Sequence, residues 1–103
     1  MLRLSLLAVL AALVGACGDA SSPLPPSPVT GVIVEIHGEG SDIRSFTLAS
    51  GDETYEIRIA DDVDYGFDLA HLREHQAAGE AVRCRVEDRG GAAYALTIED
   101  VPQ

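Results

Sequence analysis

The chain has 103 residues, enough for one small domain, and its 17 Asp and Glu outnumber seven Arg, with no Lys, to give a formal net charge of −10 at pH 7. Such an acidic chain repels a phosphate backbone, because nucleic-acid affinity comes mainly from cationic side chains that displace counterions. The composition therefore argues against nucleic acid as a partner, and the excess of acid favours solubility.

The first 16 residues have the pattern of a secretion leader. One cation, Arg3, is followed by an apolar stretch that ends in small residues. The stretch is shorter than the about 20 apolar residues that a membrane span needs, and it has the length of a signal-peptide core. We therefore predict a signal peptide over residues 1–16, whose removal would leave 17 acids against six Arg, a net charge of −11.

Cys17 ends the tetrapeptide Val14-Gly15-Ala16-Cys17, which resembles the lipobox of bacterial lipoproteins. In that family the cysteine sulfur receives a diacylglyceryl group, and the cysteine becomes the first residue of the mature chain. The resemblance implies an anchor in the cell membrane or, as the Gly18 after the cysteine favours, the outer membrane, with the domain facing the periplasm or the exterior. The alternative is a disulfide between Cys17 and Cys84, the other cysteine of the sequence.

A tether follows the cysteine over residues 17–29. Its segment GDASSPLPPSPV contains four Pro and three Ser and has no apolar periodicity, so we expect it to stay extended. At about 3.1 Å per residue in polyproline geometry, this segment would hold the domain up to roughly 35 Å from the lipid.

Alternation of apolar and polar residues predicts three strands after Thr30. The first lies in GVIVEIHG, and its expected inward side chains are Val32, Val34 and Ile36. Residues 43–48 and 53–59 form the next two, joined by a hairpin at Gly51-Asp52. In the third strand the expected inward side chains are Tyr55, Ile57 and Ile59.

A short helix is predicted after the third strand, because the segment LAHLREHQAAG places Leu69 and Leu72 three residues apart. Asp68 is the expected N-cap, and Gly79 is the expected C-terminal stop.

Two further strands follow the helix and are joined by a turn at DRGG. The inward side chains expected in them are Val82, Cys84 and Val86 in the first, and Tyr94, Leu96 and Ile98 in the second.

The predicted order is strand, strand, strand, helix, strand, strand over residues 30–101, with a tail at 102–103. This mainly β plan resembles the OB-fold, a small five-stranded Greek-key barrel, with the helix between the third and fourth strands. It is also similar to small secreted bacterial domains in which phrases like GEAVRCRVE and AYALTIED form the fourth and last strands. Both resemblances imply an OB-like barrel, although an open five-stranded sheet or an SH3-like barrel with one helix would fit the same pattern.

The resemblance to the OB-fold implies a binding surface on the outer face of strands two and three. Arg44, Glu56 and Arg58 are the candidate ligand-binding residues on that face. The alternative is that these opposite charges only pair across neighbouring strands.

The loop DDVDYGFD offers carboxylates of the kind that calcium prefers, and its candidate metal ligands are Asp61, Asp62 and Asp64. The EF-hand spacing fails, however, because Phe67 falls where the loop needs Gly. The alternative is that these acids are solvated and lie near a helix N-terminus, where negative charge is favourable.

His71 and His75 are four residues apart, so a helix would place both on one face, as a bridging transition metal requires. A third ligand would have to be His37 or an acid, and no motif places either nearby. The alternative is a pair of surface histidines.

We predict neither an enzyme nor a cofactor, because Cys84 alternates with buried positions and no ordered Ser, His and Asp set is present. The main hypothesis is a membrane-anchored, non-catalytic OB-like binding module of the bacterial cell envelope. Its partners would be the membrane, through acylated Cys17, and an envelope protein. The alternatives are a calcium- or transition-metal-binding lipoprotein that uses the acidic loop and the helix histidines, and a structural subunit that docks through an edge strand.

Overall fold

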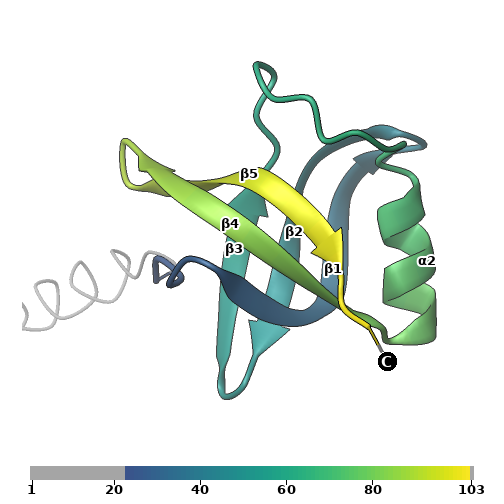
Figure 1. Ribbon diagram of the computed structural model, residues 1–103, viewed down its shortest axis with the longest axis horizontal. Coiled ribbons are helices and arrows are strands. Elements are labelled where there is room, and N and C mark those ends of the chain that lie inside the picture. The colour runs from purple at the N-terminus through teal and green to yellow at the C-terminus, as the bar shows by residue number, and fades with distance from the viewer. Residues whose placement is uncertain (1–22, 103) are drawn as a thin grey trace, which may run out of the picture.

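The computed structural model describes residues 23–102 and contains five strands and one helix in the predicted order (Figure 1). The predicted signal peptide, Cys17 and the beginning of the tether lie outside these residues. The elements are β1 (Val29–Glu39), β2 (Asp42–Ser50), β3 (Glu53–Arg58), α2 (His71–Ala78), β4 (Ala81–Arg89) and β5 (Ala92–Asp100).

The strands close into a barrel in the order β1-β2-β3-β5-β4, with β4 pairing back onto β1. All neighbours are antiparallel except β3 and β5, whose short parallel contact joins Ile57 to Ala93 and Arg58 to Tyr94. This closure confirms the OB-like barrel and excludes the open sheet. The closure is short at β3, where only Ile57 and Arg58 pair with β5.

β1 curves along its length, and it pairs with one neighbour near its beginning and with the other beyond it (Figure 1). Its first four residues pair with β4, and its remainder pairs with β2. Gly31 lies near the beginning of β1, where a Cβ would come within 2.3 Å of the Ala49 backbone oxygen. Glycine is therefore required for the close approach of β1 and β2.

A β-bulge in β1 overturns part of the predicted alternation. Ile33 pairs with Leu48 and Glu35 with Thr47, so Val34 is the extra residue on β1. Ile33 is buried, whereas Val34 is 51% exposed. The prediction that Val34 points inward was wrong, because one inserted residue shifts the pleat to the opposite face.

β5 contains a similar bulge. Arg85 pairs with Thr97 and Val86 with Ala95, which leaves Leu96 unpaired and 37% exposed. Ala93 and Ala95 are buried in its place. The prediction that Tyr94 and Leu96 point inward was therefore wrong, whereas Ile98, beyond the bulge, is buried as predicted.

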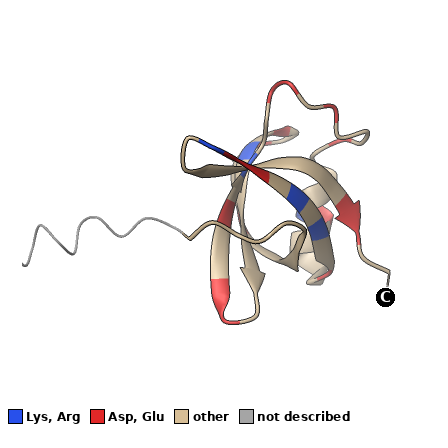
Figure 2. Ribbon diagram, turned by 60° about the vertical axis from the view of Figure 1, so that its left-hand side comes forward, with Lys and Arg blue, Asp and Glu red and all other residues tan. Residues whose placement is uncertain are grey.

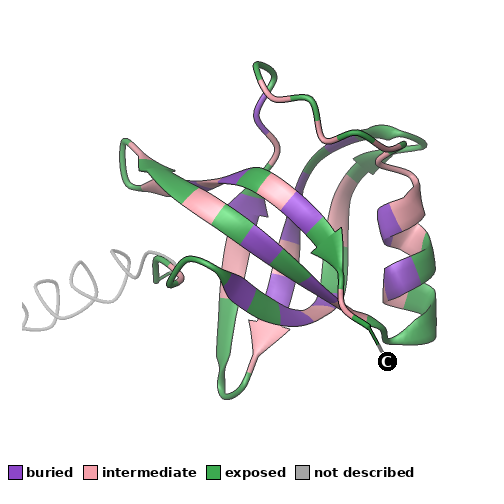
Figure 3. Ribbon diagram, in the orientation of Figure 1, coloured by how far each residue is buried: buried purple, intermediate pink, exposed green. Residues whose placement is uncertain are grey.

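The core consists of apolar side chains from all five strands and from the helix, shown by burial in Figure 3. Fully buried side chains include Phe46, Leu48, Ile57, Leu72 and Cys84.

The helix α2 lies at one end of the barrel, beside β1 (Figure 1). Leu72 and His75 are its buried residues. The Arg73 guanidinium donates hydrogen bonds to the backbone oxygens of Gly38 and Gly40 in the β1–β2 hairpin, at 2.9 and 3.1 Å. These contacts fix the position of the helix on the barrel.

The end of the helix was predicted correctly, but its beginning was not. Gly79 adopts the left-handed conformation, with φ of 68°, and ends α2 as expected. Asp68 is not the N-cap, because that position is Ala70. The Asp68 carboxylate accepts a hydrogen bond from the Ala70 backbone N–H at 3.0 Å, which forms a turn just before the helix.

Candidate functional site

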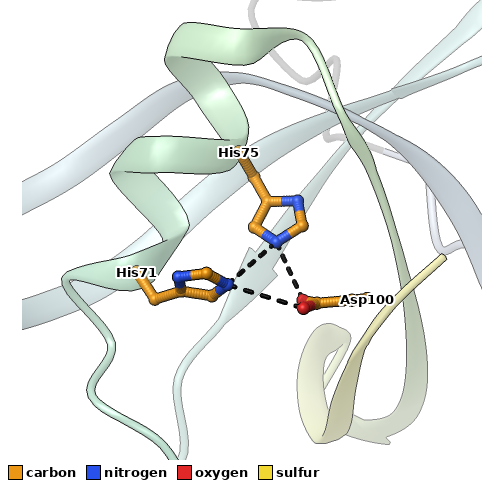
Figure 4. Close-up of side chains that lie close together, drawn as sticks. All are labelled: His71, His75 and Asp100. Atoms are coloured by element: carbon orange, nitrogen blue, oxygen red, sulfur yellow. Dashed lines mark hydrogen bonds and ion pairs between the residues drawn. The ribbon is translucent and has the colours of Figure 1, made fainter. Parts of the chain in front are cut away.

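Three potential metal ligands meet between α2 and the end of β5 (Figure 4). The Nε2 atoms of His71 and His75 are 3.2 Å apart. The His75 Nε2 lies 2.8 Å from Asp100 Oδ1, and the His71 Nε2 lies 3.6 Å from Asp100 Oδ2. We call these three residues the His–His–Asp cluster.

The second ring nitrogen of each histidine is held by an acceptor. The Nδ1 of His71 contacts the Glu74 carboxylate, and the Nδ1 of His75 lies 3.3 Å from the backbone oxygen of Glu80. The hydrogen bond to Glu74, more than the nearby Asp100 charge, raises the pKa of His71 above its ordinary value. Both acceptors orient the rings so that the two Nε2 atoms face Asp100.

The chain brings the cluster together in two ways. The four-residue spacing places His71 and His75 on one face of α2. The reversal at Gly79 leads directly into β4, whose Val82 pairs with Asp100 in the antiparallel register of β4 and β5. The last residue of β5 therefore lies beside the helix.

The side chains of the cluster differ in their exposure. The His75 side chain is 7% exposed, whereas those of His71 and Asp100 are 41% and 68% exposed. A shallow hollow that includes Phe67, His71 and Asp100 opens on the exposed side. The cluster is thus fixed at His75 and accessible to solvent from one side.

A separate groove of about 410 Å³ lies where β2 begins, β3 ends and β5 begins. Arg44 and Arg58, both predicted ligand-binding residues, line it together with Tyr94 and with two acids, Asp42 and Asp61. We call this the arginine groove.

The third predicted ligand-binding residue lies beside the arginine groove rather than in it. Glu56 is 4.0 Å from the Arg58 guanidinium, and both side chains line a smaller neighbouring hollow. Both residues belong to β3, so this pair lies within one strand and is not the pairing across neighbouring strands that the alternative interpretation expected.

The predicted acidic metal ligands do not lie with the helix histidines. Asp61 lines the arginine groove, and the Asp64 carboxylate accepts a hydrogen bond from the Gly66 backbone N–H. Asp62 forms an ion pair with Arg89 at 3.0 Å, and the hydrogen bond from that guanidinium lowers the pKa of Asp62. Within residues 23–102, the group with ligand atoms close enough for one ion is the His–His–Asp cluster.

The sequence left the third member of the cluster open as His37 or an acid and did not single out Asp100. It was one of many acids in the chain, and only its place at the end of β5 distinguishes it. The third histidine, His37, pairs instead with Glu35 at 3.5 Å.

Cys84 is a buried free thiol in the described part of the chain, as its alternation with Val82 and Val86 predicted. Burial raises its pKa to about 12, and the Glu99 charge acts in the same direction. At neutral pH the thiol is therefore protonated and unsuited to nucleophilic chemistry.

The described chain is thus a small, closed OB-like barrel with a side-chain cluster at its helix and a charged groove on its strands. Comparison of the chain with protein-family models, curated protein sequences and solved structures found no match. Among residues 23–102, no helix has the length and apolar character needed to cross a bilayer.

Proposed function

We propose that this protein is a lipid-anchored, non-catalytic binding module of the bacterial cell envelope, and that its barrel binds a protein partner at the arginine groove. The observation that carries the proposal is the groove itself. It brings Arg44 and Arg58 together with Tyr94 at the junction of β2, β3 and β5. Strands two and three form the binding face of OB-folds, so the groove lies where that architecture commonly binds ligands.

The lining of the groove favours a polypeptide as the ligand. Two Arg and two Asp line the groove together with Tyr94, so the groove presents both signs of charge and an aromatic side chain. Tyrosine and arginine are enriched at protein interfaces, where they supply apolar area together with hydrogen bonds. A protein segment carries the mixture of charged and apolar groups that such a lining complements.

The charge of the whole chain favours a partner with a cationic surface. The net charge is −10, and Figure 2 shows acidic positions over strand ends and over the loop that precedes the helix. This field steers positively charged surfaces toward the barrel and repels polyanions.

The tether and the lipidated cysteine would place the groove close to a membrane-bound or envelope partner. The support for this part of the proposal is the resemblance of Val14-Gly15-Ala16-Cys17 to a lipobox, followed by the Pro- and Ser-rich segment. An acylated cysteine with several chains anchors a protein firmly, because each buried methylene contributes about 0.8 kcal/mol.

Site-directed photo-crosslinking in intact cells tests the groove. A photoreactive phenylalanine analogue replaces Tyr94 in the full chain, which carries a C-terminal tag for purification and mass spectrometry. Leu96 provides the matched control position, because it lies on the same strand and is exposed but does not line the groove. We expect one discrete envelope protein to crosslink from position 94 and not from position 96.

The double variant Arg44→Ser and Arg58→Ser should reduce the yield of that crosslink. Its melting temperature should stay near that of the parent chain, because both side chains are exposed. Equal crosslinking from both positions, or no discrete product from position 94, would contradict the proposal.

A further inference from the structure

We propose that the His–His–Asp cluster is a Zn²⁺-binding site in which His71, His75 and Asp100 supply three ligands and water supplies the fourth. This inference is independent of the arginine groove, because the two sites share no residue.

The spacing of the three ligand atoms suits a tetrahedral ion. Zn²⁺ binds His nitrogen and Asp oxygen at about 2.0–2.2 Å, and in a tetrahedron this places neighbouring ligand atoms about 3.3 Å apart. The two Nε2 atoms are 3.2 Å apart, and their nearest Asp100 oxygens, Oδ1 for His75 and Oδ2 for His71, lie at 2.8 and 3.6 Å. With one ligand atom taken from each residue, the three atoms lie within 4.8 Å of one another. A small adjustment of exposed side chains would therefore bring all three atoms to one ion.

The surroundings of the histidines leave their Nε2 lone pairs for a cation. The Glu74 carboxylate and the Glu80 carbonyl can only accept hydrogen bonds, so they favour, in each neutral ring, the tautomer that has its proton on Nδ1. The two Nε2 lone pairs then face each other and the Asp100 carboxylate. Three electron-rich atoms at these distances repel one another unless a proton or a metal cation lies between them, and in the zinc-bound cluster the metal takes the place of the proton.

The contacts at Nδ1 are also those that metal-bound histidines make. A ligating histidine usually donates its other ring N–H to a carboxylate or a backbone carbonyl, which fixes the ring and raises its basicity as a ligand. His71 uses a carboxylate and His75 uses a carbonyl. The cluster thus has a second layer of supporting contacts as well as its three ligands.

The ligand types select the metal. Two imidazoles and one carboxylate suit zinc and related transition metals, whereas calcium and magnesium prefer oxygen ligands alone. The exposure of His71 and Asp100 leaves one side of the site open to water. Three protein ligands with one open position are an established arrangement for protein-bound zinc.

Metal binding would join two elements that are far apart in the chain. His71 and His75 belong to α2, and Asp100 is the last residue of β5. An ion that binds the folded chain and not the unfolded chain stabilises the fold by mass action. Zinc at 100 times its dissociation constant should raise the melting temperature by at least roughly 10 °C for a protein of this size.

The test measures zinc binding to the full chain purified in detergent and stripped of metal with a chelator. Competition with a chromophoric chelator gives the affinity and stoichiometry, and Co²⁺ in place of zinc reports coordination through its visible absorption. We expect one equivalent of Zn²⁺ per chain, an intense Co²⁺ spectrum typical of four ligands, and no comparable melting shift with Ca²⁺.

Two variants and two matched controls assign the site. Asp100→Ala and His71→Gln should each weaken zinc binding at least about tenfold, since loss of a supporting contact alone usually costs 10–100-fold. Glu99→Gln removes the neighbouring carboxylate, and His37→Gln removes the histidine outside the cluster, and both should bind zinc like the parent. Buried His75 is left unchanged, so that the variants keep the core intact.

The proposal is overturned if the parent chain binds no equivalent of zinc, in which case protons alone hold the cluster together. It is also overturned if Asp100→Ala and His71→Gln bind zinc as tightly as the parent chain. Retention of zinc by the Arg44→Ser and Arg58→Ser variant would show that the two sites act separately, so that failure at one does not decide the other.

Discussion

Gly31 shows how much of this barrel depends on a missing side chain. The residue is buried near the beginning of β1, and an added Cβ would lie 2.3 Å from the Ala49 oxygen and 2.9 Å from the Ala49 carbonyl carbon. Both atoms belong to the backbone of β2, so no side chain can rotate away to make room. The two strands could keep their pairing only if they moved apart.

Gly31→Ala should therefore destabilise the protein by about 1–3 kcal/mol, the usual cost of overpacking. Urea denaturation measures the effect as a lower midpoint with an unchanged slope. Thr30→Ala is the control, because Thr30 is the exposed neighbour in the same strand. Equal stability of the two variants would mean that β1 and β2 do not approach as closely as described.

Asp100 illustrates the opposite case, in which an ordinary residue gains a special environment. Nothing in its sequence neighbourhood separates it from the other acids near the C-terminus. Its carboxylate lies beside two histidines because β5 ends next to the beginning of β4, which directly follows α2. The histidine pair was recognisable from its spacing, and its partner was not.

At the scale of elements, the Tyr65 side chain joins the loop between β3 and α2 to β5, in addition to the ion pair of Asp62 with Arg89. The Tyr65 hydroxyl donates a hydrogen bond to the Ala95 backbone oxygen at 2.7 Å and accepts one from the Ala60 N–H at 2.9 Å. Burial is the main reason that the pKa of Tyr65 is raised. The hydroxyl thus connects the beginning of the loop, at Ala60, to β5, at Ala95.

Tyr65→Phe should lower the free energy of unfolding by about 1 kcal/mol, because two backbone groups lose their partner. Hydrogen exchange should be faster at Ala60 than in the parent chain. Tyr55→Phe is the matched control, since Tyr55 packs against the core and no hydrogen bond of its hydroxyl is found within residues 23–102. If Tyr55→Phe has the larger effect, the loop does not depend on this contact.

The two bulges also belong to the scale of elements. Val34 and Leu96 are the extra residues of β1 and β5, and both are exposed although the residue before each, Ile33 or Ala95, is buried. The bulges could not be recognised from the sequence, because Val34 and Leu96 are as apolar as the inward-facing residues and continue the regular alternation in their strands. A strand with apolar residues on both faces does not specify its inward face by pattern alone.

At the scale of the whole molecule, closure of the barrel determines which residues meet. The parallel contact of β3 with β5 brings Tyr94 beside Arg58, which forms one side of the arginine groove. Closure also places the end of β5 beside the helix. Both proposed sites therefore arise from the position of β5, which connects them across the barrel.

The lipid anchor is a property of the whole chain that remains a prediction. Cells fed a labelled fatty acid should incorporate the label into the parent protein and into Cys84→Ala, and not into Cys17→Ala. On cell fractionation, Cys17→Ala should leave the membrane fraction in which the parent protein is found. Labelled Cys17→Ala, or parent protein that is free of membranes, would exclude lipidation at Cys17.

The sequence by itself determined the number, order and approximate limits of the strands and helix, the turn at Gly51 and the helix stop at Gly79. These features depend on residues close together in the chain, through alternation, helical spacing and the conformational freedom of glycine. Only the tertiary structure decided the closure of β3 on β5, the outward positions of Val34 and Leu96, and the meeting of Asp100 with the helix histidines. Those depend on register between strands distant in the chain, which a single sequence does not encode in any local pattern.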